Sequence, residues 1–328
     1  MRLRRQTRGV RCRTFLSVVL LVHVVACNVS GDGAGRDRAL RALQGAVMTG
    51  TLGDRKLVES SGLTVSSADA NLRAGVLWSN NDSGNDETLF AMDSAGRALA
   101  RWRVTGATNA DWEAISTGAC ADGPCLYIAD VGDNSARRRK VTIWRVPEPI
   151  VVSDPDRSND KSPKPSDTAP AERLDFVYPD GAHDVEAIWV SPDTSVWLVT
   201  KRPHTAPGGR FRNVLLFRLP AAAWSSTSPV TAELVDSLPL TPIRETTDGW
   251  VTDAAFVPGR VALRTYGHVV LFDADSATGR PGALLARCTT AALRDRRGEA
   301  IAWLPGGRLM LTSEGKGSRV WAGACAPG

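Results

Sequence analysis

Short hydrophobic runs rich in β-branched and aromatic residues follow one another along the chain, separated by clusters of Gly, Pro, Asn, Asp and Ser. Runs of this length, with such turn residues between them, favour strands over helices. The runs also come in groups, and each group opens with a related five-residue stretch. The five copies lie at residues 60–64, 111–115, 184–188, 252–256 and 298–302. An internal repeat of this kind indicates an architecture built from similar units.

Four groups predict four strands each, and the last predicts three. The predicted strands are 60–65, 76–79, 88–92 and 99–104; 112–116, 126–129, 141–146 and 173–178; 185–190, 196–200, 214–219 and 232–238; 251–257, 261–264, 268–272 and 283–287; and 300–304, 308–312 and 319–322. A spare strand at 46–52 can complete the fifth group. The sequence therefore predicts an all-β fold over residues 46–328, a five-bladed β-propeller closed by that N-terminal strand.

The long connection at 153–172 is rich in Ser, Asp, Pro and Lys. Such a composition cannot bury much apolar surface, so we expect a disordered loop insertion.

The first 26 residues have the pattern of an export signal. Six arginines precede an apolar run at 15–26 that is too short to stay as a membrane-spanning helix. The run ends in Val24-Val25-Ala26-Cys27, which resembles a bacterial lipobox, and Cys27 would then carry the lipid. Residues 27–45 are small and polar and predict a flexible tether. The alternative is an ordinary signal peptide in which Cys27 has no role.

The charge of the chain follows from this leader. Subtracting its six arginines from the net charge of +5 leaves −1. The basic balance therefore belongs to export, and we expect no nucleic-acid partner. The predicted location is the cell envelope, with a monomer attached to the membrane through Cys27. Asn28 is not the aspartate that retains lipoproteins in the inner membrane, so a Gram-negative source would favour the outer membrane or periplasm.

Four cysteines remain after the leader and Cys27. An even number in an exported chain favours disulfides over a metal site. Cys120 and Cys125 lie close together across a short turn, which leaves Cys288 to pair with Cys325.

The repeated stretch also carries candidate chemistry. The first strand of each propeller blade lines the central channel, so one residue of each copy is expected at the axis: Ser61, Glu113, Glu186, Asp253 and Glu299. Carboxylates at such close range repel one another, and a bound cation would neutralise them. Calcium accepts several oxygen ligands and is the predicted ion. The alternative is a hydrated structural channel in which the acids bond to backbone amides and water.

A second set of polar residues follows the second strand of each blade, at one mouth of the channel. Lys201, Arg202 and Arg264 are candidates for binding an anionic ligand, together with Asp133, Asn134 and Glu314. Asp82 is a candidate general base. The alternative is that residues 82–84 and 132–134 serve as turns.

The five axial residues resemble the calcium-activated nucleotidase (apyrase) family, whose ligand order is Ser, Glu, Glu, Ser, Glu. Ser-Gly-Leu at 61–63, Lys201-Arg202 and Val-Ala-Leu-Arg at 261–264 are also similar to strands of that family. The resemblance implies a five-bladed fold with one central calcium ion. Residues 81–83 are Asn-Asp-Ser where the family has Asp-Asp-Arg, which weakens the implication of nucleotide hydrolysis. Two functions stay open: an envelope module that binds an anionic ligand or partner, and a calcium-dependent hydrolase of phosphorylated or carbohydrate substrates.

Overall fold

The computed structural model describes residues 40–152, 163–205, 212–241, 247–294 and 297–326. The predicted signal peptide, Cys27 and most of the tether lie outside these ranges, as do residues 153–162 of the predicted insertion. None of the helices in the described ranges has the length and apolar character needed to cross a membrane.

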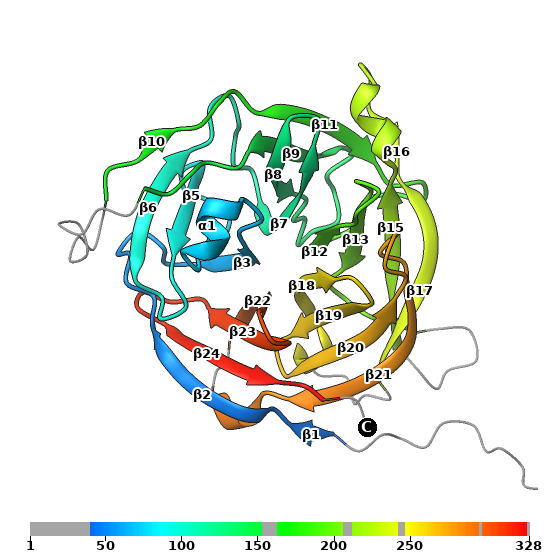
Figure 1. Cartoon of the computed structure of the whole chain (residues 1–328). Coiled ribbons are helices and arrows are strands. Elements are labelled where there is room, and N and C mark those ends of the chain that lie inside the picture. The colour runs from blue at the N-terminus through cyan, green and yellow to red at the C-terminus, as the bar shows by residue number, and fades with distance from the viewer. Residues whose placement is uncertain (1–39, 153–162, 206–211, 242–246, 295–296, 327–328) are drawn as a thin grey trace, which may run out of the picture. The chain divides into compact units, whose positions relative to one another are not determined.

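From residue 40 onward the chain forms a five-bladed β-propeller (Figure 1). Each blade is an antiparallel meander of four strands. From the axis outward, blade 1 has β3 (Ser60–Val65), β4 (Leu77–Asn81), β5 (Thr88–Met92) and β6 (Ala98–Arg103), and blade 2 has β7 (Trp112–Cys120), β8 (Gly123–Asp130), β9 (Val141–Pro147) and β11 (Glu172–Val177). Blade 3 has β12 (Val185–Val190), β13 (Val196–Thr200), β15 (Arg212–Leu219) and β17 (Glu233–Thr241), and blade 4 has β18 (Val251–Val257), β19 (Arg260–Thr265), β20 (His268–Ala274) and β21 (Pro281–Thr289).

Blade 5 closes the ring. Its strands β22 (Gly298–Leu304), β23 (Arg308–Ser313) and β24 (Arg319–Ala324) come from the C-terminal part of the chain, and β2 (Gln44–Thr51) supplies the fourth. Strand β2 runs antiparallel to β24, with Val47 opposite Ala322 and Thr51 opposite Arg319. The predicted exchange of the N-terminal strand is therefore confirmed, and it covers the edge that β24 would otherwise expose.

The propeller begins earlier than predicted. Strand β1 (Arg41–Ala42) lies in the segment expected to be tether and pairs in parallel with Cys288 and Thr289 of β21. Strand β10 (Ser166–Asp167) lies in the segment expected to be disordered, and it pairs in parallel with β6. Both short strands add to the outer edge of a blade, where free backbone N–H and C=O groups can pair with a passing chain whatever its side chains are. The polar composition of these two segments therefore did not indicate strands.

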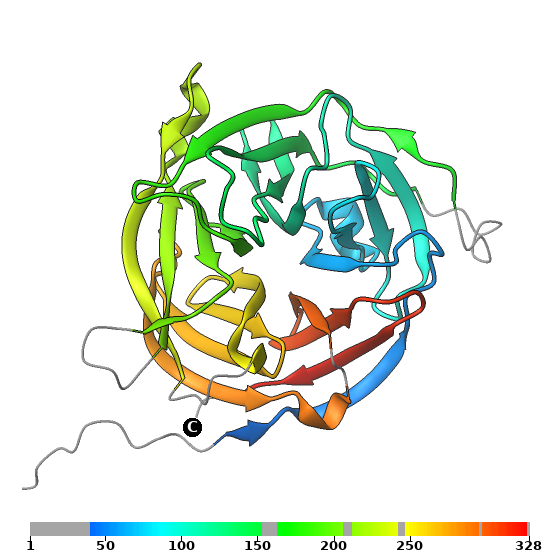
Figure 2. The same cartoon turned by 180° about the vertical axis from the view of Figure 1, so that it is seen from behind.

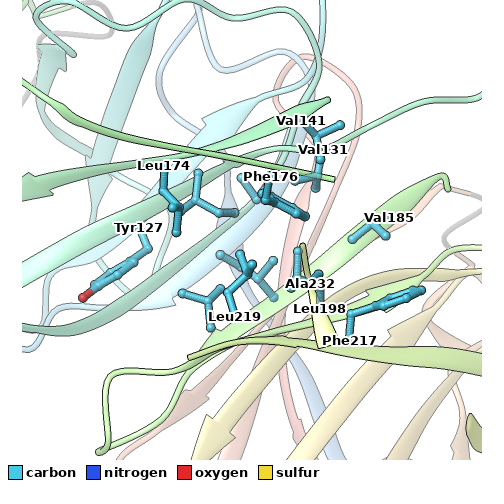
Figure 3. Packing of buried hydrophobic residues seen from close by; sticks show 14 of the residues in the cluster. Tyr127, Val131, Val141, Leu174, Phe176, Val185, Leu198, Phe217, Leu219 and Ala232 are labelled. Atoms are coloured by element: carbon cyan, nitrogen blue, oxygen red, sulfur yellow. The ribbon is translucent and has the colours of Figure 1, made fainter. Parts of the chain in front are cut away.

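The core consists of hydrophobic clusters where neighbouring blades face each other. Figure 3 shows the cluster between blades 2 and 3, where Tyr127 and Phe176 of one blade face Leu198 and Phe217 of the next. These side chains are essentially buried. Burying one such side chain stabilises the fold by about 1.5–3 kcal/mol, so the contacts between blades supply much of the stability.

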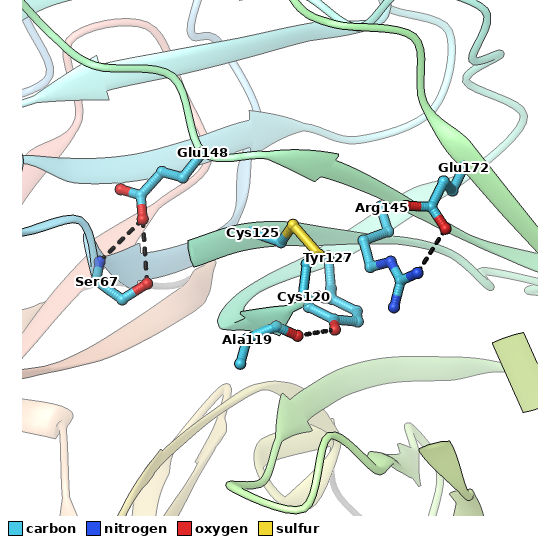
Figure 4. The surroundings of a disulfide bond; sticks show 8 residues. All are labelled: Ser67, Ala119, Cys120, Cys125, Tyr127, Arg145, Glu148 and Glu172. Carbon is cyan, nitrogen blue, oxygen red and sulfur yellow. Dashed lines mark hydrogen bonds and ion pairs between the residues drawn. A yellow bond between two sulfur atoms is a disulfide. The ribbon is translucent and has the colours of Figure 1, made fainter. Parts of the chain in front are cut away.

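Both predicted disulfides are present. Cys120–Cys125 closes the β7–β8 hairpin (Figure 4), and Cys288–Cys325 joins β21 of blade 4 to the segment after β24 of blade 5. Near the first disulfide, Glu148 accepts hydrogen bonds from the backbone N–H of Ser67, 3.0 Å away, and from its hydroxyl at 3.1 Å. Glu148 follows β9, so this carboxylate ties blade 2 to the loop after β3 of blade 1.

The five inner strands β3, β7, β12, β18 and β22 surround the axis, as the views from both ends show (Figures 1 and 2). Every inner strand starts at the same end of the axis, because each blade repeats the same meander. Residues near the start of these strands are therefore brought together although they lie far apart in the sequence.

Candidate functional site

Each inner strand carries a β-bulge near its start. In blade 1, Ser60 pairs with Asn81 and Gly62 with Asn80, which leaves Ser61 unpaired between them. The same shift skips Glu113 in β7 and Glu186 in β12. A bulge leaves one residue without a cross-strand partner and changes the direction of its side chain. The repeated stretch of the sequence is thus a repeated bulge at one level of the channel.

Blade 4 differs from the prediction by one residue. Val251 pairs with Thr265 and Asp253 with Arg264, so the bulged residue is Thr252 and not Asp253. In blade 5 the shift falls between Gly298 and Ile301 and includes Glu299. The equivalent positions of the five blades are therefore occupied by Ser61, Glu113, Glu186, Thr252 and Glu299, which we call the axial ring.

Asp253 is not part of the axial ring, because it occupies the next position along β18. Its side chain is completely buried and accepts hydrogen bonds from the backbone N–H groups of Leu63 (3.2 Å), Ile301 (2.9 Å) and Ala254 (2.8 Å). These donors belong to blades 1, 5 and 4. The carboxylate therefore lies across the axis and joins three inner strands.

The residues at the positions equivalent to Asp253 in other blades leave room for its side chain because they are small. They are Gly62, Ala114 and Ala187 in blades 1 to 3. A Cβ at position 62 would lie 2.5 Å from the backbone nitrogen of Ile115, so blade 1 has room only for glycine there. One level of the channel thus holds a single large polar side chain.

The three glutamates of the axial ring are almost fully buried, with 2% of Glu113, 2% of Glu186 and 4% of Glu299 exposed. Ser61 donates a hydrogen bond of 3.2 Å to Glu113 Oε2, and Thr252 donates to the backbone carbonyls of Gly298 and Glu299 at 3.0 and 2.7 Å. The ring therefore gathers carboxylate and hydroxyl oxygens from all five blades.

Burial and mutual repulsion disfavour the charged forms of these acids. Burial, and then the neighbouring carboxylate of Glu186, raise the pKa of both Glu113 and Glu299 well above the ordinary value. Burial raises the pKa of Glu186 to about 8, although the ammonium group of Lys201 opposes the change. Acids in this condition gain much from a nearby cation.

Asp111 extends the acidic group toward blade 1. Asp82, Asp111 and Glu113 each offer a carboxylate oxygen within 4.8 Å of the others. Burial, followed by the charge of Asp82, raises the pKa of Asp111 to about 6. Asp111 opens the repeated stretch in the sequence, but it was not among the predicted site residues. The signal in the sequence was its place two residues before Glu113.

Two nearby residues hold the carboxylates of Asp111 and Glu113 in place. Asp130 Oδ1 accepts a hydrogen bond of 3.1 Å from the backbone N–H of Asp111. Gly132 lies against both carboxylates, since a Cβ at this position would be 2.2 Å from Glu113 Oε1 and 2.5 Å from Asp111 Cγ. A larger residue at 132 would therefore displace the two acids.

The three predicted cations are not equivalent. Lys201 is only 7% exposed, and its ammonium group contacts Glu186 Oε1. Arg264 is completely buried beneath Gly298, where an added Cβ would be 1.8 Å from its guanidinium. Arg202 keeps an exposed side chain, which lies over the ring of Trp250 with 4.8 Å to the centroid. Of the three, Arg202 is the one placed to meet a ligand from solvent.

The remaining predicted residues have structural partners. The carboxylate of Asp133 accepts hydrogen bonds from the backbone N–H groups of Arg137 and Arg138 within its own turn. The carbonyl of Asn134 accepts a hydrogen bond of 3.2 Å from Arg202. Glu314 forms an ion pair with Arg297 at 2.6 Å. These contacts agree with the turn alternative for Asp133.

A polar cavity of about 590 Å³ opens between blades 4 and 5. Tyr266, His268 and Thr290 line it together with the Arg297–Glu314 pair. Burial, and then the charge of Glu299, raise the pKa of Tyr266. A smaller cavity of about 280 Å³ lies at the opposite end of the channel, between the far ends of the inner strands. The sequence analysis predicted neither cavity.

No protein-family model matches the chain, and no curated protein sequence matches it. Among solved structures, glutaminyl cyclase of Myxococcus xanthus is 13% identical, with a TM-score of 0.46 over 88% of this chain and 100% of its own. The PQQ-bound aldose sugar dehydrogenase of Streptomyces coelicolor is 12% identical, with a TM-score of 0.45 over 87% and 99%. A gluconolactonase of Xanthomonas campestris is 15% identical, with a TM-score of 0.38 over 87% and 91%. Similarities this distant say nothing about what this chain binds or transforms.

The position of Asp253 predicts a test of its structural role. Asp253→Ala should lower the free energy of unfolding by about 3 kcal/mol or more, because it leaves three buried N–H groups without an acceptor. Asp253→Asn should cost less, since its carbonyl oxygen can replace Oδ2, which accepts from both Leu63 and Ile301. Urea unfolding of the two variants measures the difference. Equal stability of Asp253→Ala and the parent protein would contradict the role.

Proposed function

We propose that the axial ring binds a divalent calcium ion, with Glu113, Glu186 and Glu299 as charged ligands and the hydroxyls of Ser61 and Thr252 beside them. The observation that carries the proposal is that three buried carboxylates stand at equivalent bulge positions of three different blades, close enough for their charges to act on one another. Such a group is strongly destabilised by its own charge unless a cation accompanies it.

The donor set fits this ion. Calcium takes six to eight oxygen ligands in flexible geometry, and the five ring positions offer only carboxylate and hydroxyl oxygens. Softer metals prefer imidazole or thiolate ligands. The hydroxyl of Thr252 also supports the resemblance to the calcium-activated nucleotidase family, because the bulge in blade 4 puts a serine-like residue at the fourth position.

We further propose that the mouth above the ion captures an anionic ligand or envelope partner. A bound cation would make the acidic mouth attractive to an anion, and Arg202 offers a second positive charge at the rim. The polar cavity beside Tyr266 is large enough for the organic part of a small ligand.

A calcium-dependent hydrolase is the second candidate, and the Asp82–Asp111 pair is the observation that favours it. Burial and the neighbouring Asp82 bring the pKa of Asp111 to about 6, which lies in the range suited to a general base near neutral pH. The metal would supply charge stabilisation for an anionic substrate. Asp82 or Asp111 would accept a proton from the attacking water.

The first test concerns calcium and pH. Burial raises the pKa of Glu113 and of Glu299 well above the ordinary value of 4.5, so in the window above pH 4.5 the folded state without metal retains protons that the unfolded state has released. Stability without metal should therefore fall as pH rises through this window, while the stabilisation by calcium should grow, because calcium needs the ionised carboxylate. At a hundredfold excess over Kd, calcium should add about 2.7 kcal/mol.

Thermal melting in calcium and in chelator, between about pH 5 and about pH 8, measures this effect. Glu113→Gln and Glu186→Gln should each weaken the response to calcium. Glu172→Gln is a suitable control, because Glu172 pairs with Arg145 at the outer part of blade 2. Melting curves that do not differ between calcium and chelator at any pH would contradict the proposed ion.

The second test separates binding from hydrolysis. Purified protein with calcium would be offered nucleoside di- and triphosphates, phosphomonoesters and glycosides. Turnover that falls at least about a hundredfold in both Asp82→Asn and Asp111→Asn would establish the hydrolase. Binding without turnover, weakened in Arg202→Gln, would establish the binding module. If neither depends on these residues, the mouth is not the site.

The envelope location rests on residues 1–26 and on Cys27. We propose export followed by lipid attachment at Cys27, which anchors the propeller to a membrane. Cys27→Ala should move the protein from the membrane fraction to the soluble fraction of the cell envelope. A variant that still sediments with membranes would show that the anchor is elsewhere.

A further inference from the structure

Lys201 occupies an unusual position for a lysine. It directly follows β13, and its backbone N–H bonds to Asp184 O while its carbonyl accepts from Val251, both at 2.9 Å. These two bonds fix its main chain between the starts of β12 and β18. The side chain then extends into the channel, where it is 9% exposed.

The ammonium group of Lys201 lies among the acids of the axial ring. It contacts Glu186, whose side chain is 3% exposed, and its charge also acts on Glu113 and Glu299. Lysine is almost never this buried unless it is paired. The charge of Arg264 also acts on Glu299.

A buried ion pair of this kind contributes little net stability, because desolvation of both charges opposes their attraction. The pair matters because the ammonium group of Lys201 occupies an oxygen of Glu186. The oxygen of Glu186 that meets the ammonium group is one of the oxygens that a metal ion in the ring would use. The ammonium group and a metal ion bound to the same carboxylate would also repel each other.

We infer that Lys201 is a tethered counter-ion that competes with the metal for Glu186 and thereby sets the cation selectivity of the axial ring. The inference rests on the proposed calcium site. Since the ammonium group already supplies one positive charge, a monovalent ion offers no advantage over it. A divalent ion has twice the charge and can displace it, so Lys201 raises the threshold for occupation and keeps the acids paired in its absence.

The test is calcium affinity, measured by titration calorimetry on the purified protein without substrate. Lys201→Met removes the competing charge and should bind calcium about tenfold or more tightly than the parent protein. In chelator the same variant should melt at a lower temperature, because Glu186 then lacks its partner. Lys140→Met is the matched control: it removes one positive charge that pairs with Asp175 on the outer part of blade 2. Its calcium affinity should stay within about twofold of the parent.

A second variant keeps the test decisive if Lys201→Met folds poorly. Combining Lys201→Met with Glu186→Gln removes both charges of the pair, so it should recover stability in chelator but bind calcium more weakly than Lys201→Met alone. Either variant can also be titrated with sodium, which should stabilise Lys201→Met more than the parent protein.

The outcomes separate this inference from the proposed function. Tighter binding by Lys201→Met supports the inference, even if the parent protein binds no calcium, in which case the proposed function of the parent fails. Equal or weaker binding by a folded Lys201→Met, with calcium bound by the parent, overturns the inference and leaves the calcium site standing. Absence of binding in both proteins overturns both.

Discussion

Five inner strands meet around one axis, and the space between them is the constraint on which the rest of the structure depends. The space is narrow enough that one level of the channel holds a single large side chain, Asp253, with Gly62, Ala114 and Ala187 around it. One level closer to the mouth, the bulged positions of three inner strands are glutamates. The same crowding therefore joins the strands at one level and creates a concentrated negative charge at the next.

The acids at the two levels have different surroundings. Asp253 is surrounded by backbone N–H donors, which are fixed parts of the sheet and satisfy its oxygens directly. Burial nevertheless raises the pKa of Asp253 well above the ordinary value. The ring glutamates have hydroxyls and the cations Lys201 and Arg264 near them, and burial raises the pKa of these acids too. The oxygens of Asp253 already have fixed hydrogen-bond donors, whereas the oxygens of the ring are the candidates for binding an ion. This contrast separates a structural acid from the candidate ligands.

The strands could be predicted because hydrophobic runs and turn residues recur with each blade, and both disulfides followed from the four cysteines that remain after the predicted leader and Cys27. The axial ring was nearly predicted. Thr252 was missed because a bulge shifts register by one residue, and alternation of polar and apolar residues cannot show where a shift falls. The burial of Arg264 was missed because it depends on Gly298 in the next blade. Such contacts between distant segments leave no local pattern in the sequence.

Ring closure has a consequence for the order in which the molecule can be made. Thr49 of β2 donates a hydrogen bond to the carbonyl of Val320 across 271 residues of sequence, so β2 must wait for a partner that is synthesised much later. Pairing across such a separation is slow, and the unpaired edge is exposed meanwhile. Four blades can form before the circle closes, and blade 5 is complete only when β2 meets β24. The Cys288–Cys325 bond joins β21 of blade 4 to the segment that follows β24, next to this closing pair of strands.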